Sequence, residues 1–230
     1  MKKNIVVLTG AGMSAESGIA TFRGSDGLWE GHSVEEVASP EGWEKNREMV
    51  LDFYNQRRRQ MGSVEPNDGH KGLKDLEEDF NVTIITQNVD DLHERANSSN
   101  ILHLHGEITK VRSTLHPELV YDVRYKDIVL GDKCEKGAQL RPHIVWFGEM
   151  VPMLEKAASL TATADILVII GTSMVVYPAA SLYRYAPENT PVYIIDPDIP
   201  EVYIPNLTKI QKGASEGVKE LTKLLKTYLN

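Results

Sequence analysis

The stretch from residue 10 to residue 23, which reads GAGMSAESGIATFR, constrains this chain more than any other. It follows the short β-branched run at residues 5–8, so it lies where a first strand gives way to a helix. Gly10 and Gly12 allow the backbone to approach a phosphate closely, and the N-terminus of a following helix attracts an anion. The stretch predicts a dinucleotide-binding loop, with Ala15 in place of the third glycine of the usual pattern. A glycine-rich turn that only caps a helix is the alternative.

Runs of Val, Ile and Leu recur along the chain and are mostly separated by helical patterns. They cover residues 5–8, 82–85, 101–104, 166–170 and 192–195. Nearly continuous apolar runs are typical of strands that are covered on both faces, and their alternation with helices indicates parallel crossovers. We therefore expect an α/β fold: a Rossmann-like, doubly wound parallel sheet with a small inserted module.

Two long insertions interrupt this alternation. The first contains a helical stretch at about residues 43–61 and is followed by a helix at about 70–80, whereas the second, from 107 to about 141, is poor in regular pattern. We assign the small module to about 31–65 and 107–141, and the large Rossmann-like part of this single domain to about 1–30, 66–106 and 142–230. Helical spacing also predicts a core-facing helix at 217–229. The cleft between the two parts is the expected substrate site.

Composition narrows the class of protein. The net charge of the 230-residue chain is −8 and no basic run exceeds residues 57–59, so a nucleic-acid partner is not expected. The single cysteine, Cys134, excludes an internal disulfide and suits a reducing compartment. The first apolar run ends at Thr9, too early for a signal peptide, and no later run is long enough for a membrane span. We expect a cytoplasmic enzyme that does not associate with membranes.

Polar residues follow the predicted strands, where the loops of an open parallel sheet meet a ligand. They are Gln87, Asn88 and Asp90 after the second strand, Thr172 and Ser173 after the fourth, and Asp196 after the fifth. Amides, hydroxyls and carboxylates can bond ribose and phosphate oxygens, although each residue alone could equally be a turn or cap residue. His105 ends the third strand, where it could act as a general base or be structural, and His103 is expected on the same face.

Seven short motifs, in this order, resemble those of the sirtuins, the NAD-dependent protein-lysine deacylases. They are GAGMS at residues 10–14, TFR at 21–23, TQNVD at 86–90, LHG at 104–106, VWFGE at 145–149, GTS at 171–173 and GAS at 213–215. The resemblance covers almost the whole chain. It implies a large Rossmann domain and a small module, with NAD and an acyl-lysine peptide meeting in the cleft between them.

The resemblance also implies roles for individual residues. His105 and Asn88 are implied as catalytic, with His105 taking a proton from a ribose hydroxyl after the acyl oxygen has attacked the sugar and nicotinamide has left. At strand-end residues 196–198 the chain reads Asp-Pro-Asp where the family commonly has Asn-x-Glu. The implied NAD-binding residues are Gly10, Ala11, Gly12, Ser14, Ala15, Thr21, Phe22, Arg23, Trp29, Gln87, Asn88, Val89, Asp90, Gly171, Thr172, Ser173, Asp196, Pro197, Asp198 and Ala214.

The implied substrate-binding residues lie in two places. Val145, Trp146, Phe147, Gly148 and Glu149 resemble the strand that pairs with the substrate peptide through backbone hydrogen bonds.

Tyr54 and Arg57 are three residues apart and share one face of the first inserted helix. They resemble the pair at the base of the acyl pocket in the desuccinylase and demalonylase branch of the family. A solvated basic face with Tyr54 packed sideways is the alternative. Because a guanidinium and a phenol can bind a carboxylate, we expect succinyl or malonyl groups to be removed at least as well as acetyl groups.

The small module departs from the family pattern. Sirtuins usually carry two Cys-x-x-Cys pairs there, whereas Ser113, His116, Cys134 and Gly137 occupy the corresponding positions. Two possible ligands cannot complete a structural zinc site, so zinc is not expected. The module would then be held by apolar residues or be less ordered than usual; the candidates are Leu115, Leu119, Val120, Tyr121, Ile128 and Leu130.

Two other functions remain open from the sequence. An ADP-ribosyltransferase or NAD hydrolase would use the same NAD loops without a peptide-pairing strand. A non-catalytic sensor of NAD or ADP-ribose would not need His105 and Asn88. The leading expectation is a monomeric NAD-dependent deacylase that acts on acyl-lysine proteins or peptides.

Overall fold

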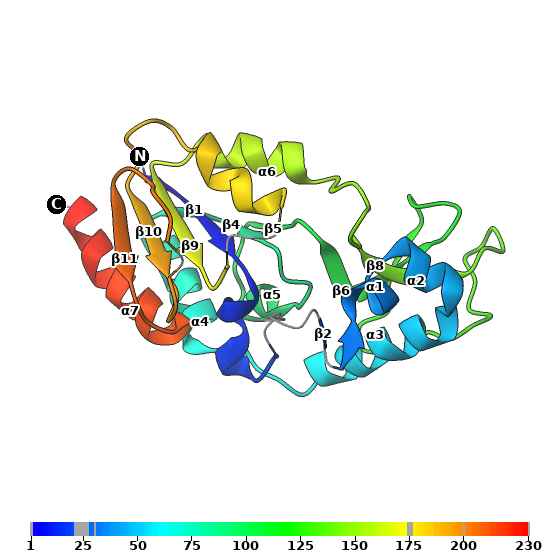
Figure 1. The fold of residues 1–230 in the computed structure, drawn as a ribbon. Coiled ribbons are helices and arrows are strands. Elements are labelled where there is room, and N and C mark those ends of the chain that lie inside the picture. Colours follow the sequence, from blue (N-terminus) through cyan, green and yellow to red (C-terminus); the bar gives the residue numbers. More distant parts are fainter. Residues whose placement is uncertain (1, 21–27, 30, 174–176, 200, 230) are drawn as a thin grey trace.

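A six-stranded parallel sheet forms the centre of the larger part of the molecule (Figure 1). The computed structural model describes residues 2–20, 28–29, 31–173, 177–199 and 201–229. The strand order is β11-β10-β9-β1-β4-β5. The strands are β1 (Asn4–Thr9), β4 (Asn81–Thr86), β5 (Ile101–His103), β9 (Ile166–Ile170), β10 (Val192–Ile195) and β11 (Leu207–Ile210). The expected doubly wound parallel sheet is therefore confirmed, and its edge strand β11 is an addition to the predicted strands.

Helices cover both faces of this sheet, which explains the continuous apolar runs. On one face, α4 (Asp68–Asp75) and α7 (Ala214–Leu225) pack against β1, β9 and β10 through side chains such as Leu73 and Leu221. On the other face lie α6 (Leu154–Thr161) and the 3-10 segment η4 (Ala179–Tyr185). Figure 1 shows these two helical layers on opposite sides of the strands.

The predicted helices have different bounds in the structure. The stretch expected at 43–61 is divided into α2 (Pro40–Lys45) and α3 (Arg47–Met61), because Asn46 leaves the helical conformation and accepts a hydrogen bond from Met49 N as the N-cap of α3. The helix expected at 70–80 is α4 followed by the turn η3 (Leu76–Glu78). A short helix, α5 (Leu92–Arg95), lies between β4 and β5.

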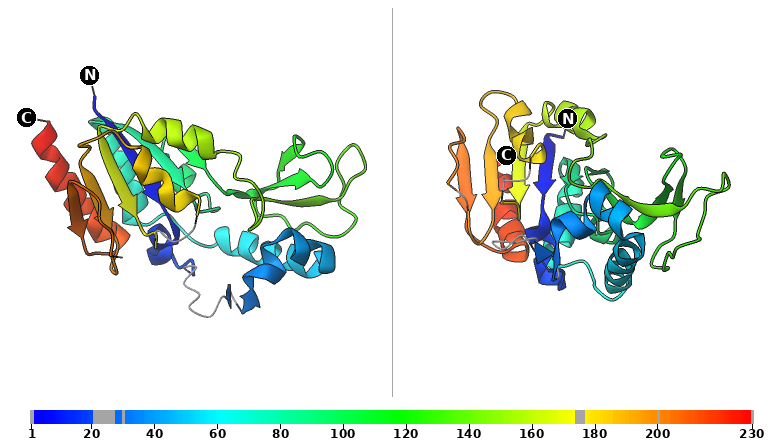
Figure 2. Two further views of the ribbon diagram at one scale, coloured as in Figure 1. Left: turned by 45° about the horizontal axis from the view of Figure 1, so that its top comes forward. Right: turned by 45° about the vertical axis from the view of Figure 1, so that its right-hand side comes forward.

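The second insertion is more regular than the sequence indicated. It forms an antiparallel sheet of β6 (Gly106–Ser113), β7 (Val120–Asp122) and β8 (Leu140–Ile144). These strands face α1 (Val34–Val37), α2 and α3, and Figure 2 shows them at the opposite end of the molecule from β11. A two-stranded ribbon, β2 (Leu28–Trp29) with β3 (His32–Ser33), precedes α1.

The apolar residues that were expected to hold the small module, which is the second lobe of the molecule, contribute unequally to its core. Ile128 is buried, and Leu119 and Tyr121 are partly buried against the same core. Leu115, Val120 and Leu130 are exposed, so their predicted packing role is wrong. The lobe is packed instead around aromatic side chains of α2, α3 and the segment after β8, chiefly Trp43, Phe53, Tyr54 and Trp146. Within the described residues, no helix has the length and apolar character needed to span a membrane.

Candidate active site

The loop after β1 is pressed against the loop after β9. Gly10 N donates to Ile170 O (2.9 Å) and Gly12 N donates to Gly171 O (2.8 Å). A Cβ atom on Gly12 would lie 2.6 Å from Gly171 Cα, and one on Gly10 would lie 2.7 Å from Gly171 O. The two glycines are therefore required by the close approach of two backbones, at the edge where the strand order reverses direction.

Within the described residues 10–20, this loop is not followed by an α-helix, contrary to the prediction. Two 3-10 turns, η1 (Ala11–Met13) and η2 (Ala15–Ser17), are closed by bonds from Met13 N to Gly10 O and from Ser17 N to Ser14 O. Contact with Gly171 holds Gly12 in place, and Gly18 ends the second turn with a φ of 88°. The described part of this loop therefore lacks the helix N-terminus from which an anion site was expected.

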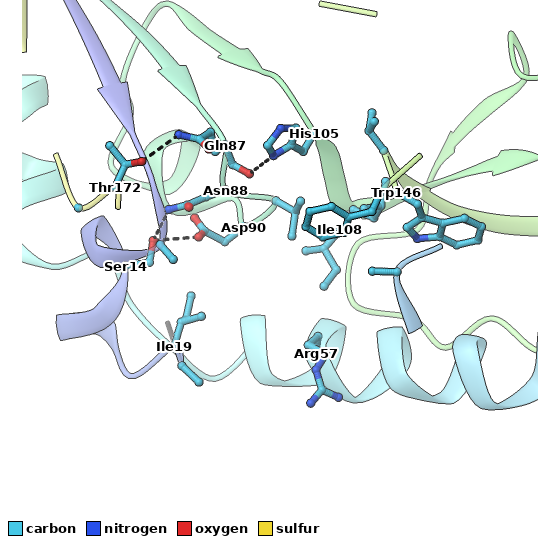
Figure 3. A pocket seen from close by; sticks show the side chains of 18 of the residues that line it. Ser14, Ile19, Arg57, Gln87, Asn88, Asp90, His105, Ile108, Trp146 and Thr172 are labelled. Atoms are coloured by element: carbon cyan, nitrogen blue, oxygen red, sulfur yellow. Dashed lines mark hydrogen bonds between the residues drawn. The ribbon is translucent and has the colours of Figure 1, made fainter. Parts of the chain in front are cut away.

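A network of side chains joins this loop to the loop after β4 (Figure 3). Asn88 Nδ2 donates to Gly10 O (3.0 Å) and to Ser14 Oγ (3.1 Å), and Ser14 Oγ donates to Asp90 Oδ2 (2.8 Å). Gln87 Nε2 donates to Thr172 Oγ1 (3.3 Å), which links β4 to β9. Burial raises the pKa of Asp90, and the Ser14 hydroxyl offsets part of that rise. Residues from three strand ends therefore converge, as predicted.

His105 lies at the centre of this arrangement, one residue beyond Leu104. Its Nδ1 is 3.1 Å from Gln87 O. Because a carbonyl oxygen only accepts, Nδ1 carries the hydrogen and Nε2 keeps its lone pair in the neutral ring. Burial lowers the pKa of His105, which favours that neutral form. A neutral imidazole in this orientation can accept a proton at Nε2.

His103 has different surroundings. Its Nε2 is 2.7 Å from Glu94 Oε1 and its Nδ1 is 3.2 Å from Asn88 O, so both nitrogens face acceptors. The Glu94 carboxylate helps to raise the pKa of His103 despite the opposing effect of burial. His103 thus supports the loop that carries Asn88.

One cavity of about 460 Å³ connects the two lobes. Most of the residues implied by the resemblance line it, including Gln87, Asn88, Asp90 and His105. The others are Ala11, Gly12, Ser14, Tyr54, Arg57, Val89, Val145, Trp146, Phe147, Gly148, Glu149, Gly171, Thr172, Ser173, Asp196 and Asp198.

Some predicted residues lie elsewhere. Of the described residues, Gly10, Ala15, Pro197 and Ala214 are outside the cavity lining; Gly10 contributes backbone behind it, and Ala214 begins α7. Asp196 Oδ1 accepts from Asp198 N (2.9 Å), so part of that carboxylate caps its own turn. Thr21, Phe22 and Arg23 are outside the described residues, and Trp29 is described only through its backbone in β2.

The far end of the cavity lies between α3 and the segment after β8. Tyr54 is fully buried and accepts a hydrogen bond from Trp146 Nε1 (3.0 Å). Arg57 Nη1 donates to Phe53 O (2.9 Å), and its guanidinium carbon is 3.7 Å from the centre of the Phe53 ring. In Figure 3 the guanidinium is turned away from His105. Tyr54 and Arg57 therefore share the cavity lining, whereas the described contacts of Arg57 are to its own helix.

The segment 145–149 is not a strand. It is a turn beyond β8, closed by a bond from Glu149 N to Trp146 O (3.0 Å) and by Gly148 with a φ of 89°. The backbone turns because the Glu149 carboxylate is bound back to Trp146 N (2.8 Å). The strand conformation predicted for this segment is thus wrong, although all five residues line the cavity.

Several lining residues, most of them apolar, were not predicted from the sequence. Gln60 and Met61 could have been found, because they lie on the same face of α3 as Arg57, one turn later. Ile19, Ile108 and Tyr177 carry no comparable signal. The complete set of missed residues is Ile19, Ala20, Ala38, Gln60, Met61, Ile108, Ile144, Val151, Tyr177 and Pro178.

Three of the positions that correspond to zinc-binding cysteines, Ser113, His116 and Cys134, are joined by hydrogen bonds. Cys134 Sγ donates to Ser113 Oγ (3.4 Å), and Ser113 Oγ accepts from Leu115 N (3.3 Å) and His116 N (3.1 Å). Across the described ranges, no three His, Cys, Asp or Glu side chains are grouped to hold a metal ion.

Comparison with known proteins identifies the family. The model of the Sir2 family matches residues 10–178. An NAD-dependent protein deacylase of Helicobacter pylori strain ATCC 700392 / 26695 is 58% identical over 220 residues, covering 95% of this chain and 96% of that protein. One from Bacteroides thetaiotaomicron is 54% identical over 229 residues, covering 97% and 98%.

Solved structures agree with this result. A Sir2 homolog–NAD complex superposes with a TM-score of 0.86 at 40% identity, covering 99% of this chain and 91% of that one. A complex described as Sir2–p53 peptide–NAD+ superposes with a TM-score of 0.78 at 29% identity, covering 97% and 93%.

Proposed function

We propose, from the premise that this chain belongs to the Sir2 family and is an NAD-dependent protein deacylase, that His105 is its general base and that its acyl pocket favours acidic acyl groups. The single observation that carries the first part is the contact of His105 Nδ1 with Gln87 O (3.1 Å). That contact directs the basic Nε2 away from the carbonyl, so Nε2 can take a proton from a substrate hydroxyl.

The residues present fit NAD. Positions 10, 12 and 171 have no room for a side chain, so a pyrophosphate could approach the backbone of the loop after β1 closely. We propose that Thr172, Ser173 and Asp196 bind the adenosine side and that Gln87, Asn88 and Asp90 bind the nicotinamide side, with Thr21, Phe22, Arg23 and Trp29 as further NAD-binding residues. When bound, NAD supplies a sugar carbon with a good leaving group.

The residues of this chain then act in three ways. The Asn88–Ser14–Asp90 network keeps the loop after β4 rigid. The apolar side chains Ile19, Ile108 and Met61 exclude water from the reacting centre. His105 takes up the substrate's proton on its Nε2 atom. The cavity also holds the acyl oxygen and the sugar in line, and this orientation supplies much of the remaining acceleration.

The acyl preference rests on Tyr54 and Arg57. Both line the cavity from one face of α3, and Tyr54 is fully buried beneath the segment 145–149. A buried phenol and a guanidinium fork can bind a terminal carboxylate, whereas an acetyl group leaves these donors without that acceptor. Rotation of the Arg57 side chain from the Phe53 carbonyl would bring its guanidinium to such a group.

The acyl proposal is tested with a panel of peptides. The protein is incubated with NAD and matched acetyl-, malonyl- and succinyl-lysine peptides, while nicotinamide release and peptide mass are followed. We expect the acidic acyl groups to be removed with kcat/KM at least equal to that for acetyl. Removal of acetyl alone would contradict the proposed preference, and nicotinamide release without a change in peptide mass would indicate an NAD hydrolase.

We also propose that the domain divides as the sequence indicated, that the protein is a cytoplasmic monomer and that it acts without structural zinc, nucleic acid or membrane. Separate apolar cores on either side of the cavity support the division. The net charge of −8 supports the absence of a nucleic-acid partner, and the single cysteine supports a reducing compartment and the absence of structural zinc. Light scattering of the purified chain tests the monomer.

A further inference from the structure

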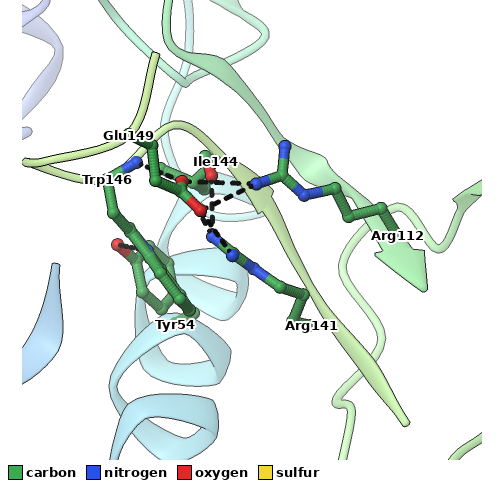
Figure 4. A network of polar contacts seen from close by, with 6 residues as sticks. All are labelled: Tyr54, Arg112, Arg141, Ile144, Trp146 and Glu149. Carbon is green, nitrogen blue, oxygen red and sulfur yellow. Dashed lines mark hydrogen bonds and ion pairs between the residues drawn. The ribbon is translucent and has the colours of Figure 1, made fainter. Parts of the chain in front are cut away.

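The segment 145–149 is held by a network of ion pairs and hydrogen bonds, which Figure 4 shows. Arg141 Nη1 is 2.7 Å from Glu149 Oε1, and Arg141 Nη2 donates to Glu149 Oε2 (3.1 Å), which makes a two-pronged pair. Arg112 Nη2 lies 3.3 Å from both oxygens of the same carboxylate. Arg141 is only 9% exposed, so solvent screens its pair with Glu149 weakly. These arginines hold the pKa of Glu149 below its usual value.

The same pair fixes the position of Trp146. Glu149 Oε2 accepts from Trp146 N (2.8 Å), and Arg141 Nη2 also donates to Ile144 O (3.1 Å), so both ends of the connecting backbone are fixed. The guanidinium of Arg141 lies 3.3 Å from the centre of the Trp146 ring. Trp43 also contacts this ring, with centroids 5.8 Å apart. The plane of the indole is therefore determined by a charge that is itself bound to Glu149.

The indole of Trp146 then determines which hydrogen-bonding role the Tyr54 hydroxyl takes in this contact. Trp146 Nε1–H can only donate, so in its 3.0 Å contact the Tyr54 oxygen must accept. Burial raises the pKa of Tyr54, so the hydroxyl keeps its own proton at neutral pH. The contact with Trp146 uses a lone pair of the Tyr54 oxygen and not its hydrogen, so the hydroxyl can act as a hydrogen-bond donor.

We propose that Arg141 and Glu149 are positioning residues that hold the indole of Trp146, and that Trp146 thereby presents the Tyr54 hydroxyl as a hydrogen-bond donor to acyl groups ending in a carboxylate. This inference rests on the proposed acyl preference and extends it to three residues. It gives Glu149 a role other than contact with the peptide, because both of its carboxylate oxygens bind residues of this chain.

The sharpest variant is Trp146→Phe, which keeps an aromatic face for Arg141 and removes the N–H donor. We expect the ratio of kcat/KM for succinyl over acetyl peptide to fall about tenfold, equivalent to about 1.4 kcal/mol. The loss should appear as a higher KM for the succinyl peptide and not as a higher KM for NAD, because the NAD loops are not in the network. An unchanged ratio in a folded Trp146→Phe enzyme overturns the proposal.

Two further variants test the ion pair. Glu149→Gln removes the charge while keeping the shape, and should lower the same ratio. Arg141→Lys keeps the charge but loses the planar fork of the guanidinium. Its succinyl-to-acetyl ratio should therefore lie between the ratio of the wild type and that of Arg141→Gln. The matched control is Asp127→Asn, which removes an exposed pair with Arg59 (2.6 Å) that also involves α3 but does not touch Trp146. A shift of the ratio in the control equal to that in Glu149→Gln contradicts a specific role.

An independent measurement separates this inference from the acyl proposal. Spectra of ¹⁵N-labelled protein report the indole N–H of Trp146, which Trp146→Phe identifies. We expect this resonance to move upfield, with faster hydrogen exchange, in both Tyr54→Phe and Glu149→Gln. If the wild-type enzyme removes only acetyl groups, the acyl proposal fails, but the positioning of Trp146 is still tested by this resonance. Movement of the resonance in both variants supports the positioning role of Glu149 and the contact with Tyr54. An unmoved resonance overturns them.

Discussion

The two ends of the cavity are built from different kinds of contact. Around the loop after β1, the close approach of two loops is made by backbone atoms, through Gly10 N with Ile170 O and Gly12 N with Gly171 O, and side chains such as Asn88 bind to that backbone. Around α3 and the segment 145–149, side chains hold one another: Arg141 holds Trp146, and Trp146 holds Tyr54. His105 lies between the two ends.

This difference matches what each end is proposed to bind. A surface that is shaped by backbone contacts keeps its shape when neighbouring side chains are replaced, which suits a ligand that does not vary. A surface made of side chains can be altered by single substitutions, which suits an acyl group that differs between substrates. Substitutions should therefore abolish function at the first end and redirect it at the second.

The largest effect is expected at His105, where the two ends meet. His105→Ala should lower deacylation by about 10²- to 10⁴-fold, because the general base is lost. NAD binding should persist, since the glycine loop and Asn88 do not depend on the imidazole. Rates come from nicotinamide release and affinity from calorimetry. Undiminished turnover would show that His105 is not the base.

Acid should weaken the backbone-built end first. His70 and His93 lie beneath it with ring centroids 4.8 Å apart, and burial lowers the pKa of His70 to about 4. The unfolded chain binds a proton at the ordinary histidine pKa of about 6.5, so folding stability falls as the pH drops from there towards 4, with His70 alone contributing about 3 kcal/mol. Denaturant titrations from pH 7 to pH 4.5 measure this fall, and His70→Gln should flatten it. An equally steep fall in the variant would assign it to other groups.

Gly12→Ala tests whether the backbone-built end tolerates any side chain. The new Cβ would lie 2.6 Å from Gly171 Cα, so one of the two loops must move. Overpacking of this kind costs about 1–3 kcal/mol, and we expect the KM for NAD to rise by about tenfold or more. Gly18→Ala is a control, since nothing lies within 4 Å of its added Cβ, although its positive φ adds local strain. Equal KM values for Gly12→Ala and wild type would contradict the close-approach argument.

Arg57→Met should redirect the side-chain-built end. We expect succinyl-lysine activity to fall by about 10- to 100-fold relative to acetyl-lysine activity, because a charge-assisted hydrogen bond is worth about 1.5–3 kcal/mol. Competition between the two peptides in one reaction measures the ratio directly. Equal losses for both peptides would mean that Arg57 supports the fold or the NAD site.

Chelation should have the smallest effect. Because the Ser113 and Cys134 positions are joined by a hydrogen bond, EDTA should leave the melting temperature and the activity unchanged. Elemental analysis showing one zinc per chain would contradict the absence of a structural metal.

Much of the fold could be predicted because it depends on local patterns. The five predicted strands coincide with β1, β4, β5, β9 and β10 to within one or two residues, since continuous apolar runs require burial on both faces. The strand-end positions of Asn88, Asp90 and His105 followed from the same reasoning. The antiparallel strands β6 to β8 were missed because charged residues such as Lys110 and Arg112 alternate with buried ones such as Val111, and this weakens the apolar signal.

The sequence by itself determined the parallel sheet, the glycine loop and which polar residues end the strands, because each depends on neighbours within a few positions. Only the tertiary structure decided that the glycine loop forms 3-10 turns, since the cause is Gly171, far along the chain. Likewise, only the tertiary structure brought Trp146 to Tyr54 and turned Glu149 back onto Arg141. Contacts between distant residues depend on how whole elements pack, and no local spacing encodes that packing.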